Sequence, residues 1–571
     1  MTSPETPPDP EPEDNRSASR RTFLRTVGIV AAGTAAAGIG AVAVGSAVNQ
    51  QPALRFDDQP ERPTGAFDHV VVVMFENRSF DNVLGWLYRP EEVPVDSSFD
   101  GLHQGTYSNP APGTTQTVPA HVYTGATDYI MSSPIPDPGE AYPHVNTQVF
   151  GTVNSSFNAP ALGQDPTMAG FVEDYIINFE RLSKGIAPTS EEYSVAMGGF
   201  SPAMLPVFST LAKEFAVFDH WHAGVPSQTF CNRSFFHAST SNGFVTNRGD
   251  GGYGKWFDAG RSNAVTIFNR LEDDGIPWRV YYDADQLISL TGVLHASTTR
   301  KYWKTNFRTM EQFYRDAESG NLPAYSFVEP RMIFNHNDMH PPYGDLRVGN
   351  NGEGVTVTNS AVSDVRAGEL LLHELYTAIR TSDKSPGSNA LNTALLVTFD
   401  EHGGTYDHVA PPAATPPGDG KRGEMDFAFD RLGCRVPAIL ISAYTAKNTI
   451  INETKHHGSL IATLTRQHGL SPLTHRDKDA PDLFDALNLA TARPPTQWPT
   501  TSPAYVPTDT DGEFAPNAEP NKAKKLSNPA KGLLGLLIAE FGDPTAPVPD
   551  SYEDAFEALT EYGQGLFGTT D

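Results

Sequence analysis

Short apolar runs rich in β-branched residues recur along the chain and alternate with helical patterns. Because a strand buried on both faces is continuously apolar, these runs predict core strands. The predicted strands cover residues 70–75, 278–282, 325–328, 394–399 and 438–442, and the predicted helices cover residues 203–215, 362–381 and 459–468. This alternation predicts an α/β fold with a central, mostly parallel sheet.

Two of the predicted strands end abruptly in ionic or amide side chains. The residues that follow them are Glu76, Asn77 and Arg78, and Asp400, Glu401, His402, Gly403 and Gly404. Ligands in open α/β sheets are usually held at the carboxyl ends of strands. Adjacent carboxylates at such a place repel each other unless a cation intervenes. Hard oxygen donors with few imidazoles therefore predict one divalent metal site that favours calcium or magnesium, with zinc and iron also left open as its occupant.

Two further polar clusters could supply the rest of a reaction centre. They contain Ser227, Thr229 and Arg233, and His336, Asp338 and His340. A cation polarises a phosphoryl oxygen, a hydroxyl beside it can attack phosphorus, and a histidine can protonate the leaving oxygen. Neither a Gly-x-Ser-x-Gly elbow nor a P-loop is present. The residues therefore favour phosphoester hydrolysis over acyl transfer.

Each cluster also has a purely structural interpretation. Glu76 could be a surface carboxylate paired with Arg78, and Thr229 could be an ordinary loop hydroxyl. His336 and His340 could be exposed to solvent. The glycine pair could only form a turn, and the segment 455–457 could simply begin a helix.

Composition narrows the possible partners. The chain has 571 residues and a formal net charge of -27. This charge argues against non-specific nucleic-acid binding and against adsorption to anionic lipid, but not against a zwitterionic headgroup or a small phosphoester. Two cysteines, Cys231 and Cys434, cannot form a disulfide framework, and whether they bond to each other stays open.

The N-terminal residues 1–48 predict export. A disordered, Pro- and acid-rich start precedes Arg20 and Arg21, and an Ala/Gly/Val stretch follows from Val27 to Val48. This order resembles a twin-arginine signal, with an uncleaved membrane anchor as the alternative. We expect a protein exported by the twin-arginine machinery, secreted or associated with the cell envelope, with no stable membrane span when mature.

The predicted organisation beyond the signal is a catalytic domain over residues 60–490. The turn-rich segments 90–170 and 240–320 are expected to be insertions over the strand ends. Residues 491–571 form a Pro-rich linker and a small helical tail, with helices expected over 532–541 and 552–567 and treated as peripheral.

Four ordered motifs over about residues 65–480 resemble the bacterial phosphoesterase family of phospholipases C and related acid phosphatases. The motifs are residues 75–81, 229–233, 337–342 and 400–404. The resemblance implies an alkaline-phosphatase-like three-layer sandwich and a Ser or Thr nucleophile on a bound metal. It departs at three positions: Cys231 stands where the family often has Pro, and Met339 and Glu140 stand where it often has His.

The resemblance also implies roles for individual residues. Glu76, Asn77, Asp400 and Glu401 would hold the metal. Thr229 would be the nucleophile and a further ligand, with Ser227 as its rival. His340 and His144 would contact the phosphoryl group or the leaving oxygen. Lower-ranked candidates are His336, Asp338, His402 and Arg233.

The expected activity is that of a phospholipase C acting on phosphatidylcholine-like diesters through the threonine. The alternatives are a broad acid phosphatase acting on monoesters and a non-catalytic protein that binds a surface.

Overall fold

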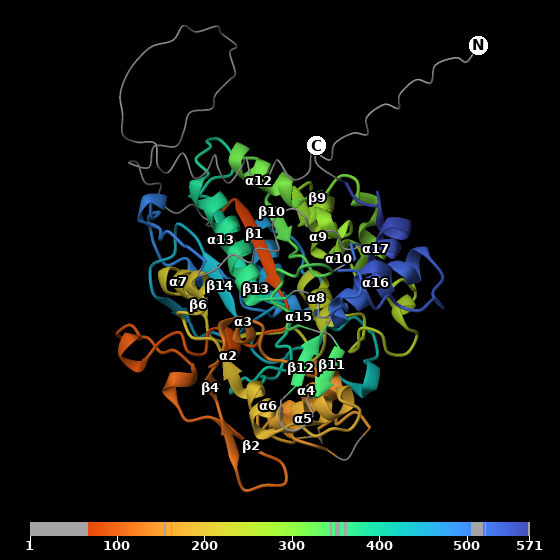
Figure 1. Ribbon diagram of the computed structural model, residues 1–571. Coiled ribbons are helices and arrows are strands. Elements are labelled where there is room, and N and C mark those ends of the chain that lie inside the picture. Colours follow the sequence, from red (N-terminus) through yellow and green to blue (C-terminus); the bar gives the residue numbers. More distant parts are fainter. Residues whose placement is uncertain are drawn as a thin grey trace, which may run out of the picture. The chain divides into compact units, whose positions relative to one another are not determined.

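An eight-stranded sheet lies at the centre of the structure, a computed structural model shown in Figure 1. The structure describes residues 67–153, 156–160, 163–342, 345–348, 355–358, 363–503, 518–519 and 521–568. The strand order is β15-β6-β14-β13-β1-β10-β8-β9. Every strand runs parallel to its neighbours except β14, which is antiparallel to both β13 and β6. The prediction of a mostly parallel sheet is therefore confirmed.

All five predicted strands are present with bounds within one residue, and the sheet holds three more. The strands are β1 (His69–Phe75), β6 (Ala216–Phe218), β8 (Trp278–Tyr282), β9 (Phe307–Thr309), β10 (Tyr325–Val328), β13 (Thr393–Phe399), β14 (Ala438–Ile441) and β15 (Thr449–Ile451). The strands absent from the prediction, β6, β9 and β15, are each three residues long, which is too short to establish a hydrophobic period.

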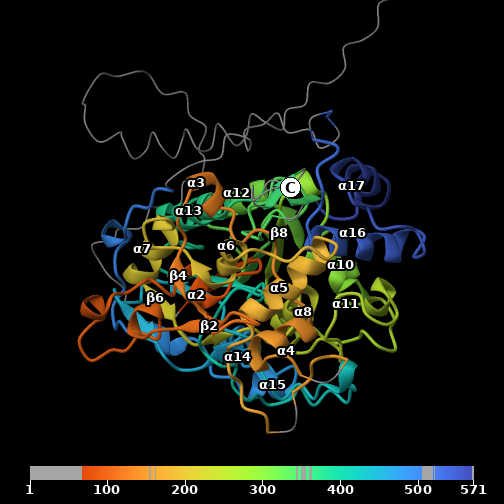
Figure 2. The ribbon, with the colours of Figure 1, turned by 60° about the horizontal axis from the view of Figure 1, so that its bottom comes forward.

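Helices lie on both faces of this sheet, so the architecture has three layers (Figures 1 and 2). One layer contains α7 (Pro206–Glu214), α12 (Met310–Ser319) and α13 (Val365–Thr381); the other contains α8 (Thr229–Ala238), α9 (Ile267–Asp273) and α14 (Gly458–His468). The three predicted helices correspond to α7, α13 and α14. Helix α7 begins at Pro206, three residues later than expected, because proline is favoured in the first helical turn. Helix α13 begins after Asp364, whose side chain accepts a hydrogen bond from the Arg366 amide.

Strands β1 and β13 are adjacent and parallel, and Phe75 pairs with Phe399 at their carboxyl ends. Both strands are apolar along nearly their whole length because helices cover both faces, and Val71 to Phe75 are fully buried. The residues that follow the two strands therefore leave the sheet side by side.

The segment between β1 and α7 gathers beyond these carboxyl ends, as the orange and yellow ribbon of Figure 1 shows. It contains α2 (Phe80–Val83), α3 (Thr127–Ile130), α4 (Tyr142–Phe150), α5 (Phe171–Leu182) and α6 (Ser190–Ser194). Helices α4 and α5 pack on each other and share an apolar cluster that includes Val145, Val149 and Phe171. In contrast, residues 240–320, also expected to be an insertion, contribute β8, β9, α9 and all of α12 to the central layers.

The C-terminal helices α16 (Asn528–Phe541) and α17 (Tyr552–Ala558) are packed into the same compact unit as the sheet rather than peripheral. The four leucines of α16 between residues 533 and 537 are fully buried. A Cβ atom added to Gly532 would lie 2.8 Å from the ring of Phe230, which neighbours Thr229. Helix α16 is apolar on most of its surface because it fills the space behind α8 rather than lying on the surface.

Among the described residues, no helix combines the length and the apolar character that crossing a bilayer demands. The paired arginines and the stretch from Val27 to Val48 lie outside the described residues, as do residues 504–517 of the linker. Export therefore stays a prediction.

Candidate active site

Glu76, Thr229 and Asp400 meet at the carboxyl ends of β1 and β13, and all three are fully buried. The Thr229 hydroxyl donates a hydrogen bond to Glu76 Oε2 at 3.2 Å. The Asn77 amide donates to Asp400 Oδ1 at 3.0 Å, and the Glu401 amide donates to the same oxygen at 2.7 Å. The residues expected to hold one metal therefore converge, although they come from three distant parts of the chain.

The loops after β1 and β13 touch each other back to back. Asn77 has a positive φ of 56°, and Gly403 and Gly404 have φ values of 62° and 67°. A Cβ atom on Gly403 would lie 2.1 Å from the Asn77 carbonyl oxygen. The Gly403 amide also donates to Glu401 Oε2 at 2.7 Å. The glycine pair therefore does more than form a turn, because it lets the loops after β1 and β13 pack closely.

We expect Gly403→Ala to disrupt the site far more than a glycine substitution with the same backbone strain elsewhere. The matched control is Gly420→Ala, since Gly420 has a φ of 72° but no heavy atom within 4 Å of its Cβ position. The control should cost about 1–2 kcal/mol of unfolding free energy, the usual penalty for a left-handed residue. Gly403→Ala should cost more and should also weaken cation binding. Thermal melting and cation titration of both variants measure this, and equal effects would contradict the packing role.

Several buried polar atoms at this place have no hydrogen-bond partner among the described residues. They are Asn77 Oδ1, Asp400 Oδ2 and Glu401 Oε1. Buried polar atoms are nearly always paired, and unpaired oxygens grouped together are typical of a cation site. Burial and the charge of Asp400 raise the pKa of Glu76 well above its ordinary value. A divalent cation would relieve this destabilisation of the ionised carboxylates, so the donor set fits an oxygen-ligated metal.

Helix α8 presents Thr229 at its first position and Arg233 one turn later. Arg233 donates to Glu76 Oε1 through Nε at 2.9 Å and through Nη2. Glu76 is therefore neither exposed nor paired with Arg78, which donates instead to the Met339 carbonyl oxygen at 2.8 Å. Burial lowers the pKa of Arg78 to about 10.

The turn that leads into α8 is fixed by Asn232. Its side chain accepts a hydrogen bond from the Val225 amide at 3.0 Å and donates to the Ser227 carbonyl oxygen at 2.6 Å. The Ser227 hydroxyl donates to the Val245 carbonyl oxygen at 2.5 Å. The rival nucleophile is therefore engaged with the main chain, whereas Thr229 faces the carboxylates.

The histidine loop is buried rather than exposed, and it joins the site through its backbone. The Glu76 amide donates to the Asp338 carbonyl oxygen at 2.8 Å. Asp338 accepts hydrogen bonds from the His340 amide at 3.0 Å and from His336 Nδ1 at 2.9 Å. His340 Nδ1 donates to the Pro341 carbonyl oxygen at 2.6 Å, and burial lowers the pKa of His340 to about 4. Its Nε2 therefore carries a lone pair, has no hydrogen-bond partner in the described segments, and lies 3.9 Å from Asp137 Oδ2.

The remaining two histidine candidates lie at the margin of the carboxylate cluster. His144 on α4 contacts Asp174 Oδ1 at 2.7 Å and lines a cavity of about 100 Å³ together with Asp137, Glu140 and Gln228. His402 Nε2 contacts the side-chain oxygen of Gln148 at 2.7 Å. Because Gln148 belongs to α4, the His402 ring points its Nε2 toward that helix.

Two buried carboxylates next to the site, Asp137 and Glu140, were not among the predicted site residues. Glu140 accepts hydrogen bonds from the side-chain amides of Asn77 and of Gln228, the latter at 3.2 Å. Neither oxygen of Asp137 has a hydrogen-bond partner among the residues that the structure describes. The signal in the sequence is the Asp-Pro-Gly-Glu segment of residues 137–140, which marks a turn but does not reveal that the turn is buried at the strand ends.

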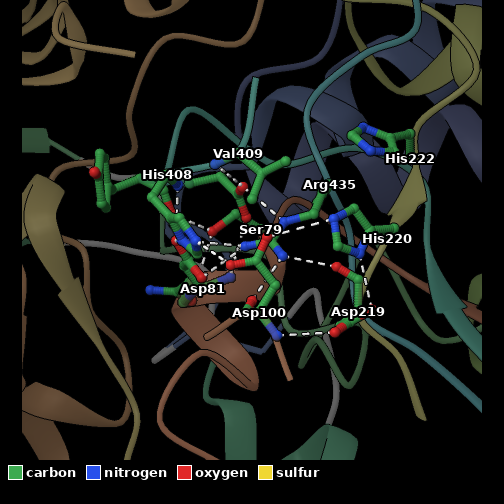
Figure 3. Close-up of polar contacts among 12 residues, drawn as sticks. Ser79, Asp81, Asp100, Asp219, His220, His222, His408, Val409 and Arg435 are labelled. Carbon is green, nitrogen blue, oxygen red and sulfur yellow. Dashed lines mark hydrogen bonds and ion pairs between the residues drawn. The ribbon is translucent and has the colours of Figure 1, made fainter. Parts of the chain in front are cut away.

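A second polar network lies around Arg435 and ties the same loops together (Figure 3). Arg435 donates to Asp407 Oδ1 and to Asp81 Oδ1, each at 2.9 Å. His408 bridges Asp81 and Asp100 through its two ring nitrogens, at 2.7 and 2.9 Å. Because Asp81 follows β1 and Asp407 follows β13, this network fixes the loops beyond the predicted metal ligands. Its groups pair with one another, so it is a structural ion network.

The free energy of unfolding should fall as pH rises, because His408 of this network and the neighbouring His220 lose their protons. Hydrogen bonds to Asp100 and Asp219 raise the pKa of His220 from 6.5 to about 9. For His408, burial alone would lower the pKa, but the charge of Asp81 and hydrogen bonds to Asp100 and Asp81 raise it to about 9. A histidine pKa that is higher in the folded than in the unfolded state stabilises the fold below about pH 6.5, and this contribution is lost as pH rises through about 9.

The measurement is chemical denaturation of wild type and His220→Gln across this pH range. The decline in the free energy of unfolding should be smaller in the variant, because one of the two titrating groups is gone. An identical pH dependence in both proteins would contradict this assignment.

Both cysteines are buried and free, so no bond joins Cys231 to Cys434. Burial raises the pKa of Cys231 to about 12, so its thiol is not reactive at neutral pH.

Several known proteins and one family model are similar to this chain. The model of the Phosphoesterase family matches residues 67–471. Non-specific phospholipase C6 of Arabidopsis thaliana is 34% identical over 455 residues, which cover 77% of this chain and 75% of that protein. Phospholipase C A of Mycobacterium tuberculosis (strain ATCC 25618 / H37Rv) is 24% identical over 458 residues, which cover 74% of this chain and 78% of that protein. A solved structure in the alkaline phosphatase superfamily from Vibrio parahaemolyticus covers 50% of this chain and 66% of its own, at 14% identity and a TM-score of 0.29.

Proposed function

Because the chain belongs to the Phosphoesterase family, we propose that it is a metal-dependent phospholipase C that hydrolyses phosphatidylcholine-like diesters with Thr229 as the nucleophile. The observation that carries this proposal is the contact between the Thr229 hydroxyl and Glu76 within a buried cluster of carboxylates. Relatives named as phospholipases C support the diester as substrate.

The side chains that would hold the cation are Glu76, Asn77, Thr229, Asp400 and Glu401. When bound, a divalent cation polarises the phosphoryl oxygens and lowers the pKa of a hydroxyl next to it. Its identity stays open among calcium, magnesium, zinc and iron, since oxygen ligands with few imidazoles suit several of them.

The remaining steps of the proposed reaction depend on side chains of the chain itself. Glu76 Oε2 is the acceptor nearest the Thr229 proton, and Arg233 fixes the orientation of that carboxylate through Oε1. As the threonine oxygen passes its proton to Glu76 and bonds to phosphorus, the bond from phosphorus to the diacylglycerol oxygen breaks, and the alkoxide takes up that proton. Water then attacks the same phosphorus, the bond from phosphorus to the threonine oxygen breaks, the phosphorylated headgroup leaves, and a proton of the water restores the Thr229 hydroxyl. Burial excludes bulk water from the nucleophile and so strengthens these electrostatic interactions.

The alternative activity is hydrolysis of phosphomonoesters by the same residues. Turnover of p-nitrophenyl phosphorylcholine and of p-nitrophenyl phosphate by the purified chain separates the two. We expect faster turnover of the diester, loss of turnover on treatment with a chelator, and recovery on adding a divalent cation. Preference for the monoester would favour an acid phosphatase. Chelator-resistant activity would contradict metal dependence, and no activity on either substrate would favour a non-catalytic binding protein.

We also propose export by the twin-arginine machinery, on the basis of Arg20 and Arg21 and the apolar stretch behind them. Changing both arginines to lysine should retain the protein inside the cell, as cell fractionation would measure. Unchanged export of the double variant would contradict this route.

A further inference from the structure

The buried carboxylates at the strand ends carry more negative charge than one divalent cation can offset. Five of them form a continuous cluster: Glu76, Asp137, Glu140, Asp400 and Glu401. Among the described residues, Arg233 is the only arginine or lysine within 4 Å of any of these groups. If all five are ionised, the excess over Arg233 is four negative charges, which Arg78 and Arg181 offset only from beyond 4 Å of Asp137. One divalent ion would halve this excess, and uncompensated buried charge is strongly unfavourable.

The part of the cluster that lies outside the first cation site has its own convergent donors. Ligand atoms of Asp137, Glu140 and His340 all lie within 4.8 Å of one another, and all three residues are buried. Within the described part of the chain, neither oxygen of Asp137 has a hydrogen-bond partner, and His340 Nε2 has none either. Two carboxylates and a neutral imidazole that face one another, with Glu140 held by Asn77 and Gln228, form a typical three-ligand site for a borderline divalent metal.

The imidazole is oriented by its surroundings as metal-binding histidines usually are. His340 Nδ1 donates to the Pro341 carbonyl oxygen at 2.6 Å, and this bond directs the lone pair of Nε2 toward Asp137. A histidine that binds a metal through one ring nitrogen usually donates a hydrogen bond from the other, which fixes the orientation of the ring.

The same group also has a route to solvent. Asp137 and Glu140 line the cavity of about 100 Å³ that Gln228 and the partly exposed His144 also border. An ion could therefore reach these carboxylates without passing through the first site.

We propose that Asp137, Glu140 and His340 bind a second divalent cation of the first transition row, such as Zn²⁺, beside the cation held by Glu76 and Asp400. This inference deepens the proposed function, on which it rests. Glu140 would connect the two sites, since it accepts a hydrogen bond from Asn77, a ligand of the first. In this arrangement His340 acts on the phosphoryl group through the cation that it holds rather than by donating a proton.

The test counts bound zinc in the purified full-length chain. The protein is stripped with a chelator, dialysed against a micromolar concentration of free Zn²⁺, and analysed for zinc and protein. Wild type should hold two equivalents, and Asp137→Asn and Glu76→Gln should each hold one. The double variant should hold none. The matched control is Asp174→Asn, a buried carboxylate nearby whose oxygens are paired with His144 and Gln148, and it should keep two equivalents.

The outcomes separate this inference from the proposed function. Two equivalents in Asp137→Asn, or a single wild-type equivalent that Asp137→Asn retains, would overturn the second site. If Asp137→Asn does not fold, His340→Gln provides the same test, with loss of one equivalent expected and retention of two contradicting the site. Turnover of p-nitrophenyl phosphorylcholine is measured on the same samples. A wild-type protein that binds two ions but has no turnover would refute the proposed function and support the second site. Full turnover with only one bound ion would support the proposed function and refute the second site.

Discussion

Replacing Thr229 with alanine should reduce kcat on the diester by about 10⁴-fold or more, the scale seen when a nucleophile is removed. The structure gives the Thr229 hydroxyl one side-chain partner, Glu76, and Arg233 still pairs with that carboxylate in the variant. The fold should therefore persist, as circular dichroism and thermal melting would show. Acid-quenched wild type should also carry the phosphorylated headgroup on Thr229, which peptide mass spectrometry detects.

Two further variants distinguish Thr229 from Ser227 as the nucleophile. Thr229→Ser keeps a hydroxyl and should retain part of the activity. Ser227→Ala removes the neighbouring hydroxyl, which donates to the Val245 carbonyl oxygen, and should stay within about tenfold of wild type because no reacting group is lost. Substantial turnover in Thr229→Ala together with loss of turnover in Ser227→Ala would move the nucleophile to Ser227.

Asp400→Asn should have opposite effects on function and on stability. We expect cation affinity to fall at least about 100-fold and turnover at least about 10³-fold. Mutating a residue that only hydrogen-bonds to a metal ligand typically lowers metal affinity or activity about 10–100-fold, and Asp400 is itself a proposed charged ligand. The metal-free variant should nevertheless melt at a higher temperature than metal-free wild type at neutral pH. Burial raises the pKa of Asp400, so its ionised form destabilises the fold in the absence of a cation, and an amide removes that charge.

The control for this pair of effects is Asp477→Asn, which changes a buried aspartate away from the site. Asp477 accepts hydrogen bonds from the Leu473 and Thr474 amides at the start of a short helix. Cation binding should be unchanged in this control, and its melting temperature should not rise. A metal-free Asp400→Asn protein that melts below wild type would contradict the view that the carboxylates repel one another.

The strand ends could be predicted from sequence because each is a local pattern. A run such as Val70–Phe75 signals a buried strand by its own composition, and the ionic residues after it stand out against that background. That β1 and β13 would be neighbours did not follow from either run. It needed the whole order of the sheet, which depends on contacts between residues more than 300 positions apart.

Other features depend on tertiary packing that no local pattern reveals. Asp137 and Glu140 reach the site only because α4 and α5 fold against each other beyond the strand ends. The pairing of Glu76 with Arg233 instead of its near neighbour Arg78 is likewise a long-range contact. The tail was expected to be peripheral because a short apolar helix after a Pro-rich linker gives no indication of where it docks.

The docking of the tail sets the order in which the protein can become active. Helix α16 fills the space behind Phe230, and the Tyr552 hydroxyl of α17 accepts a hydrogen bond from the Asn335 amide at the start of the histidine loop. Both supports follow every residue of the proposed site in the chain. A polypeptide under synthesis that already contains all of those residues would still lack the packing behind Phe230. Chains that end before α16 should therefore be inert rather than partly active.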